Sequence, residues 1–135
     1  MATYRGGCHC GRIRFEVDAP LERVTLCNCS ICTRTGYLHW TVAPERVRII
    51  AGDGEWTSYR FGTRVADHRF CPTCGISPLR IARSDPDQLD VNARCLEGVD
   101  VDALPVAHFD GRDWETAYQA REEASHGMAR RNERL

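Results

Sequence analysis

Seven of the eight cysteines in this chain fall in three short clusters, and their spacing constrains the fold more than any other feature. The clusters hold two, three and two thiols: Cys8 and Cys10; Cys27, Cys29 and Cys32; Cys71 and Cys74. A closed structural zinc site takes four such ligands, whereas three protein ligands leave a coordination position open. Four thiols are enough for one closed site, and three remain for an open one. The spacing therefore predicts a protein that binds two Zn²⁺ ions, one structural and one catalytic or labile.

The cellular compartment decides how these cysteines are interpreted. No stretch has the apolar length of a membrane span, and the first residues, MATYRGG, contain no signal-peptide hydrophobic segment. We therefore expect a cytoplasmic protein. Disulfides rarely persist in a reducing cytosol, so metal binding is favoured over the disulfide framework that eight cysteines would allow in a secreted protein. A formal net charge of -1 provides no attraction to nucleic acid or to membranes, and we expect neither as a partner.

The remaining pattern indicates one small, mainly β domain. Short runs of β-branched and aromatic residues, separated by Gly, Pro and Asp, fill most of the first hundred positions. In residues 12–17, for example, Ile13, Phe15 and Val17 alternate with polar residues and share one face. Further strands are expected at residues 23–26, 40–43, 47–50, 56–61, 66–70, 79–82 and 89–93. Their regular spacing predicts short antiparallel strands.

Two helices are expected. A short helical turn follows Cys29 and ends near Gly36, and a longer helix covers residues 114–124, with Asp113 as its N-cap. We expect residues 1–124 to form the domain and residues 125–135, which are polar and arginine-rich, to form a frayed C-terminal tail.

The sequence between cysteines gives each pair a way to face one metal ion. Pro72 and Gly75 favour a tight turn at Cys71 and Cys74, which directs both sulfur atoms to the same side. The glycines around Cys8 and Cys10 supply the bend that a one-residue spacing needs. Spacing alone leaves the partition open, because Cys71 and Cys74 could equally join Cys27 and Cys29. The fourth ligand of a three-cysteine site could be water, Cys95, a histidine or an exogenous thiol.

Three stretches, GCHCGRIRF at residues 7–15, CNCSIC at 27–32 and FCPTCG at 70–75, resemble the glutathione-dependent formaldehyde-activating enzyme family, also called the centromere-protein-V-like zinc domain. The resemblance extends over about residues 4–120. It implies a small β fold called a β-tent, related to the Mss4-like fold and stapled by zinc. It also implies that one set of cysteines holds the structural zinc and another the catalytic zinc: Cys8, Cys10, Cys71 and Cys74 for the first; Cys27, Cys29 and Cys32 for the second.

The family's activity implies a zinc-dependent carbon–sulfur lyase-type enzyme, similar to an S-hydroxymethylglutathione synthase. It would act on the adduct of a glutathione-like thiol with formaldehyde or another small electrophile. At an open three-cysteine zinc site, a bound exogenous thiol loses its proton and becomes a nucleophile. Nearby cations would help the site to carry this extra negative charge. Arg34 and Arg69, close in sequence to the cysteine clusters, are the candidates.

Other side chains near the cysteines have simpler interpretations. Tyr37, His39 and Trp40 follow the middle cluster and could form the walls of a pocket, although aromatic residues in such a position more often belong to the core. The histidines are also expected to be structural rather than acid–base groups: His9, His39, His68 and His108.

Two functions of other classes compete with the enzyme hypothesis. One is a non-catalytic, zinc-stabilised binding module. The other is a thiol redox enzyme with Cys95 as its nucleophile, which leaves the middle cluster without a purpose.

Overall fold

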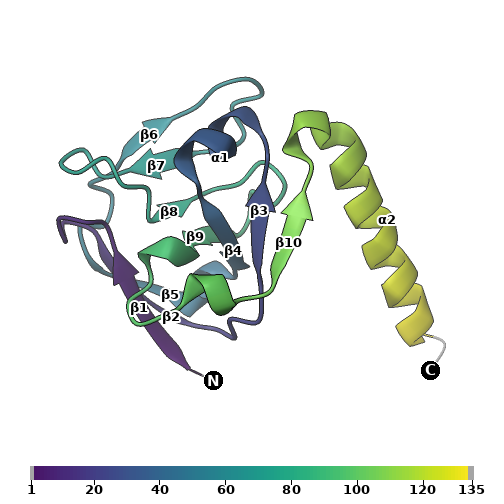
Figure 1. Ribbon diagram of the computed structural model, residues 1–135, viewed down its shortest axis with the longest axis horizontal. Coiled ribbons are helices and arrows are strands. Elements are labelled where there is room, and N and C mark those ends of the chain that lie inside the picture. Colours follow the sequence, from purple (N-terminus) through teal and green to yellow (C-terminus); the bar gives the residue numbers. More distant parts are fainter. Residues whose placement is uncertain (1, 134–135) are drawn as a thin grey trace.

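The computed structural model describes the backbone of residues 2–133 and the side chains as far as residue 124. In this part of the chain, three small β-sheets form the body, and a long C-terminal helix extends away from it (Figure 1). The predicted class, mainly β with short antiparallel strands and a C-terminal helix, is confirmed. Within the described residues, no helix has both the length and the apolar character needed to span a bilayer.

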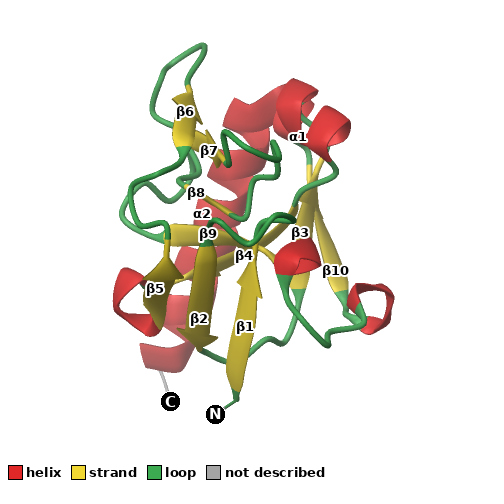
Figure 2. Ribbon diagram, turned by 90° about the vertical axis from the view of Figure 1, so that its left-hand side faces the viewer, coloured by secondary structure: helices red, strands yellow, loops and turns green. Residues whose placement is uncertain are grey.

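The first sheet has the order β1-β2-β5, formed by Thr3–Gly7, Arg14–Asp18 and Val47–Ala51. All its pairs are antiparallel, and the sheet lies at the front of the molecule in Figure 2. The alternation expected in β2 is present, since Phe15 and Val17 are buried and the residues between them are half-buried. The strand β1 was not predicted from the sequence. Gly6 is required there, because a Cβ at this position would lie 2.5 Å from the carbonyl oxygen of Cys95.

The second sheet has the order β10-β3-β4-β9-β8 and carries most of the core. Its strands are Val106–Phe109, Val24–Cys27, Leu38–Val42, Leu89–Asn92 and Leu79–Arg80. The strand β10 was also not predicted, and it pairs parallel to β3, with Phe109 opposite Cys27. The segment that follows β10 is therefore brought next to the middle cysteine cluster.

A hairpin of β6 (Thr57–Tyr59) and β7 (His68–Phe70) forms the third sheet, above the other two in Figure 2. The strand β7 leads directly into Cys71. Four short 3₁₀ helices connect the described strands and helices: η1 (Pro44–Arg46), η2 (Ala93–Cys95), η3 (Val101–Ala103) and η4 (Gly111–Asp113).

The short helix α1 (Ser30–Thr35) confirms the helical turn expected after Cys29. Cys29 is its N-cap, and its C-cap is Gly36, whose φ of 67° is the left-handed conformation that favours glycine.

The long helix α2 (Trp114–Glu133) differs from the prediction at both ends. Asp113 does not cap it, because Asp113 is the last residue of η4 and the chain continues from η4 into α2 without interruption. The helix also passes Ala124, where its end was expected, and reaches Glu133. Alanine, methionine, arginine and glutamate in this stretch have high helix propensity, and a helix that has already formed is extended at low cost. The boundary between a domain and a tail at residue 124 stays a prediction.

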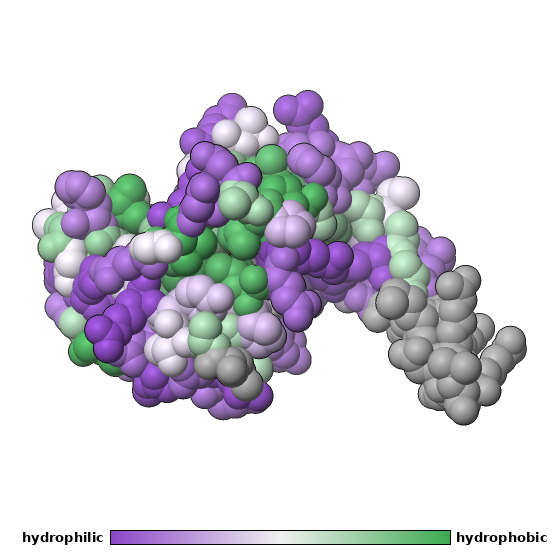
Figure 3. Space-filling model, turned by 60° about the horizontal axis from the view of Figure 1, so that its bottom comes forward, coloured by the Kyte–Doolittle hydropathy of each residue, from purple (hydrophilic) through white to green (hydrophobic). Residues whose placement is uncertain are grey.

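The described residues contain two hydrophobic clusters. The larger lies between the first two sheets and includes Phe15, Trp40 and Val91. The smaller contains Ile13, Cys8 and Cys71, against which Trp56 packs. Apolar residues also reach the surface, where Figure 3 shows a group of them bordered by hydrophilic residues.

Candidate metal centres

Cys8, Cys10, Cys71 and Cys74 converge at one point, although they come from two distant segments. The four Sγ atoms all lie within 4.8 Å of one another. The Sγ of Cys10 is 3.7 Å from that of Cys8 and 3.6 Å from that of Cys71. One segment is the loop after β1 and the other is the turn after β7, so an ion at this site would join the two ends of the β region.

Local backbone groups support these sulfur atoms. The amide of Ile13 donates to the Sγ of Cys8 at 3.3 Å, and the amide of Thr73 donates to the Sγ of Cys71 at 3.4 Å. The predicted tight turn is closed by a 2.8 Å hydrogen bond from the amide of Gly75 to the carbonyl of Cys71. Four sulfur donors with amide hydrogen bonds fit a tetrahedral zinc ion. Cys8 and Cys71 are buried, Cys74 is half-buried and Cys10 is exposed, so the first site lies at the surface with two of its four ligands covered.

Cys27, Cys29 and Cys32 form the second group, and their Sγ atoms also lie within 4.8 Å of one another. Cys27 ends β3, Cys29 caps α1, and Cys32 lies within α1. The amide of Cys32 donates to the Sγ of Cys29 at 3.4 Å. Hydrogen bonds among the three thiols lower the pKa of Cys29 and raise the pKa of Cys27 and of Cys32, so Cys29 is the first of them to become a thiolate. Three thiol donors on one side are a ligand set that fits zinc.

The Sγ of Cys32 is in contact with two nitrogen-bearing side chains. The Nε2 of His39 on β4 lies 3.2 Å away, and the Nη1 of Arg80 on β8 lies 3.9 Å away. The other ring nitrogen of His39, Nδ1, is hydrogen-bonded to the carboxylate of Asp90 on β9. Because a carboxylate only accepts, Nδ1 is the donor, and Nε2 of the neutral ring is an acceptor that faces the Cys32 thiol.

Buried aromatic and charged groups form the floor of this second site. The Arg80 guanidinium lies over the ring of Tyr37, with its Cζ 3.6 Å from the ring centroid. Tyr37 is fully buried, and its hydroxyl donates to the carbonyl of Asp90 at 2.5 Å. Arg80 and Asp90 are each 1% exposed. The floor therefore holds a buried guanidinium, which contacts Cys32, next to a buried carboxylate.

The segment after β10 covers the opposite side of the second group. The Nδ2 of Asn28 donates to the Oδ1 of Asp110 at 3.0 Å, and the backbone amide of Arg112 donates to the Oδ1 of Asn28 at 3.1 Å. Between them, Gly111 lies directly against Cys27 and Cys29. This segment is held in place by the parallel pairing of β10 with β3.

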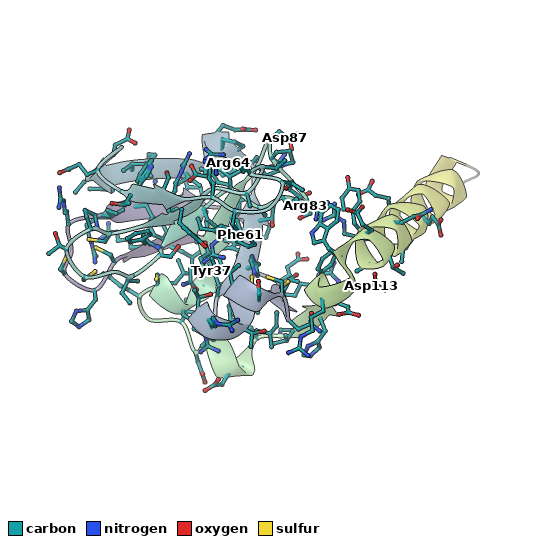
Figure 4. The ribbon with its side chains drawn as sticks, turned by 90° about the horizontal axis from the view of Figure 1, so that it is seen from above. Tyr37, Phe61, Arg64, Arg83, Asp87 and Asp113 are labelled. Carbon is teal, nitrogen blue, oxygen red and sulfur yellow. The ribbon has the colours of Figure 1, made fainter. Side chains whose placement is uncertain are left out.

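The second group opens onto a cavity of about 990 Å³, which all three of its cysteines line. None of the four cysteines of the first group lines it. Aromatic and cationic side chains form other parts of its wall, among them Phe61, Arg83, Trp114 and Arg121. Figure 4 shows sulfur atoms gathered in two separate places, with Arg83 on the side of the sheets and Asp113 at the start of α2. The four-cysteine group therefore has a complete ligand set away from the cavity, whereas the three-cysteine group is one ligand short and faces it.

Several residues singled out in the sequence lie elsewhere. Arg34 donates to the carbonyl of Ser30 within α1 at 2.8 Å, and Arg69 pairs with Asp67 at 2.8 Å, so neither faces the second group. The arginine that contacts this group is Arg80, which was not predicted from the sequence. Of the three expected wall residues, Tyr37 and Trp40 are buried, and His39 lines the cavity.

Cys95 belongs to neither group of cysteines within the described part of the chain. It lies half-buried at the end of η2. Burial, together with the negative charges of Cys8 and Cys74, raises the pKa of Cys95 to about 11. A thiol with this pKa is protonated near neutral pH and is a poor nucleophile.

The fold and the two sites define a small β protein with two thiol-rich groups of the kind that bind zinc. Comparison with known families gives a match to the glutathione-dependent formaldehyde-activating enzyme family over residues 3–110. The chain belongs to this family, as its cysteine motifs predicted. A crystal structure of a Rhodobacter sphaeroides protein is similar, with 37% sequence identity and a TM-score of 0.68. The match covers 76% of this chain and 99% of that chain. The helix α2 lies beyond the residues that the family match covers.

Proposed function

We propose that the protein is a carbon–sulfur lyase-type enzyme that joins a thiol, such as glutathione, to formaldehyde or another small electrophile, and catalyses the reverse reaction. The observation that carries this proposal is the difference between the two cysteine groups. The four-cysteine group has the full ligand set of a tetrahedral ion, whereas the three-cysteine group is one ligand short and opens onto a cavity of about 990 Å³. A cavity of this size is large enough for a tripeptide thiol. A reducing cytoplasm would keep the cysteines as thiols.

In this proposal the two groups have separate tasks. Cys8, Cys10, Cys71 and Cys74 would hold a structural zinc, and Cys27, Cys29 and Cys32 would hold a second one. When bound there, zinc supplies Lewis acidity that lowers the pKa of a substrate thiol. The side chain of His39 is suited to accept the Cys32 proton at Nε2, because Asp90 fixes the proton of the neutral ring on Nδ1.

The reaction itself needs no oxidant or reductant. A bond forms between the thiol sulfur and the carbonyl carbon, the π bond of the carbonyl breaks, and the thiol proton ends on the oxygen. The product from glutathione and formaldehyde is S-hydroxymethylglutathione. The task of the cavity walls is to hold the two reactants together and to exclude bulk water, which makes the encounter effectively unimolecular.

The direct test follows exchange between free thiol and adduct by NMR. Purified zinc-loaded protein is mixed with glutathione and formaldehyde, and the exchange rate is compared with that of the same mixture without protein. The wild type is expected to accelerate exchange. Cys27→Ser is expected to abolish the acceleration while the circular dichroism spectrum stays that of a folded chain.

The matched control is Cys95→Ser, which removes a thiol outside both groups and is expected to leave the acceleration intact. Wild-type protein with two zincs per chain and no acceleration for glutathione or other small thiols would contradict the proposal. The non-catalytic binding module would then be the better interpretation.

A further inference from the structure

Arg80 is a buried cation with no carboxylate contact to balance its charge in the described part of the chain. It is 1% exposed. The contacts of its guanidinium are the ring of Tyr37 and the Sγ of Cys32, and its Nε has no hydrogen-bond partner. Burial of a charge that has no ion-pair contact is strongly unfavourable. An arginine in this position therefore indicates that negative charge gathers beside it.

Asp90, the nearest carboxylate along the sheet, is hydrogen-bonded to His39 and forms no ion pair with Arg80 in the described residues. Arg80 and Asp90 are direct neighbours in the antiparallel pair of β8 and β9. One oxygen of Asp90 is hydrogen-bonded to Nδ1 of His39, and the other, Oδ1, has no hydrogen-bond partner. The guanidinium extends instead toward Cys32. Cys32 belongs to the three-cysteine group that faces the cavity, which is named the open cysteine group.

The charge of the open group changes when a substrate thiol binds. By formal count, a Zn²⁺ ion with three thiolates carries about -1, and a fourth thiolate takes this to about -2. Cys32 and Arg80 are buried, where water screens charge weakly, so extra negative charge beside them is costly unless a fixed cation compensates it. Arginine suits this purpose because it stays protonated in proteins.

We propose that Arg80 is a positioning residue that supplies this counter-charge and thereby makes the open cysteine group selective for the thiolate of a substrate. This inference rests on the proposed function and specifies how its site recognises a ligand. The ligand class is an exogenous thiol that binds as an anion through sulfur. A thioether of the same shape carries no negative charge on its sulfur, so Arg80 does not raise its binding affinity.

The test compares two probes, glutathione and S-methylglutathione, whose sulfur cannot become a thiolate. Their binding to zinc-loaded wild type and to zinc-loaded Arg80→Met is measured by isothermal titration calorimetry. Methionine retains much of the volume of the arginine side chain and removes its charge. Glutathione is expected to bind Arg80→Met about tenfold or more weakly, as for the loss of one charge-assisted contact. S-methylglutathione is expected to bind both proteins equally.

Two further variants separate charge from packing. Arg80→Lys keeps the positive charge and is expected to restore most of the affinity for glutathione. Arg34→Met removes an exposed arginine on α1 whose guanidinium contacts the backbone of Ser30, and it is expected to change neither affinity. Zinc per chain is measured for every variant, so that loss of the metal is not mistaken for loss of selectivity.

The outcomes distinguish the inference from the proposed function. If Arg80→Met binds glutathione and S-methylglutathione more weakly by the same factor, or binds both as tightly as the wild type does, the role of Arg80 is overturned and the enzyme proposal stands. If Arg80→Met does not fold, Arg80→Lys provides the test. Weak binding of glutathione by Arg80→Lys, with full affinity for S-methylglutathione, would contradict the role of Arg80. Absence of thiol binding by the zinc-loaded wild type would overturn both.

Discussion

Gly111 lies so close to Cys27 that no side chain fits between them. A Cβ on Gly111 would lie 2.4 Å from the Sγ of Cys27 and 2.7 Å from the Cβ of Cys29. The contact joins the start of η4 to the end of β3, and it exists because β10 pairs parallel to β3. The open cysteine group is thus shaped by a segment more than eighty residues away in the sequence.

Gly111→Ala is expected to displace Cys27 and to lower zinc content from two ions per chain to one. The clash costs about 1–3 kcal/mol of stability, as for overpacking in a core. Elemental analysis and thermal unfolding measure the two effects. The control is Gly54→Ala, where φ is 77° and nothing lies within 4 Å of the new Cβ, so strain occurs without contact to a cysteine. Retention of both zincs in Gly111→Ala would contradict the close approach.

Asn28 forms hydrogen bonds to the residues on both sides of Gly111. It donates to Asp110 and accepts from the amide of Arg112. Asn28→Ala is expected to lower stability by about 1 kcal/mol. It should also speed the release of one zinc, not both, to a coloured chelator. Gln119→Ala, which removes an amide from α2, is the control. Equal release rates in wild type and Asn28→Ala would show that the hydrogen bonds do not hold the segment over the cysteines.

His68 makes stability depend on pH in the mildly acidic range. Burial and the nearby charge of Arg80 lower the pKa of His68 from 6.5 to about 4. The unfolded chain therefore binds a proton as pH falls below 6.5, whereas the folded chain resists it until about pH 4. The folded state loses stability across this window, by about 2 kcal/mol between pH 7 and pH 5.

Urea unfolding of wild type and His68→Gln at these two pH values measures this contribution. Acid also releases zinc from thiolates, so the difference between the two proteins is the quantity that counts. The variant is expected to lose about 2 kcal/mol less than the wild type over the same interval. Identical losses would show that His68 titrates normally in the folded chain.

Cys95 distinguishes the enzyme proposal from a thiol redox enzyme. Cys95→Ser is expected to keep both zincs and the full rate of thiol–formaldehyde exchange, because Cys95 lies outside both cysteine groups and its pKa is raised to about 11. Methionine sulfoxide is a substrate on which a thiol redox enzyme could act through Cys95, so its reduction by wild type and by Cys95→Ser is the second measurement. Loss of a reductase activity in Cys95→Ser, with both zincs retained, would favour the redox interpretation instead.

The sequence was sufficient for those parts of the fold that depend on local pattern. The CxxC turn at Cys71 and Cys74 was predictable because Pro72 and Gly75 fix the backbone there. The short helix after Cys29 and the alternation in β2 were predictable for similar reasons. The grouping of the cysteines was not, since spacing allowed more than one partition and the family resemblance was needed to choose.

Features that depend on the pairing of strands far apart in the sequence could not be predicted from local patterns. Arg80 lies in an ordinary alternation, Leu79-Arg80-Ile81, where an arginine usually faces solvent. Only the position of β8 at the edge of the second sheet turns its side chain toward Cys32. The role of Gly111 likewise follows from the pairing of β10 with β3, which no local pattern indicates.

The most direct test of this account is the zinc content per chain, measured by elemental analysis for wild type and for Cys29→Ser. Two zincs in the wild type and one in a variant that remains folded would show that the open cysteine group is a separate metal site. One zinc in the wild type, unchanged by the substitution, would contradict the account and leave a β protein stabilised by a single ion at the four-cysteine site.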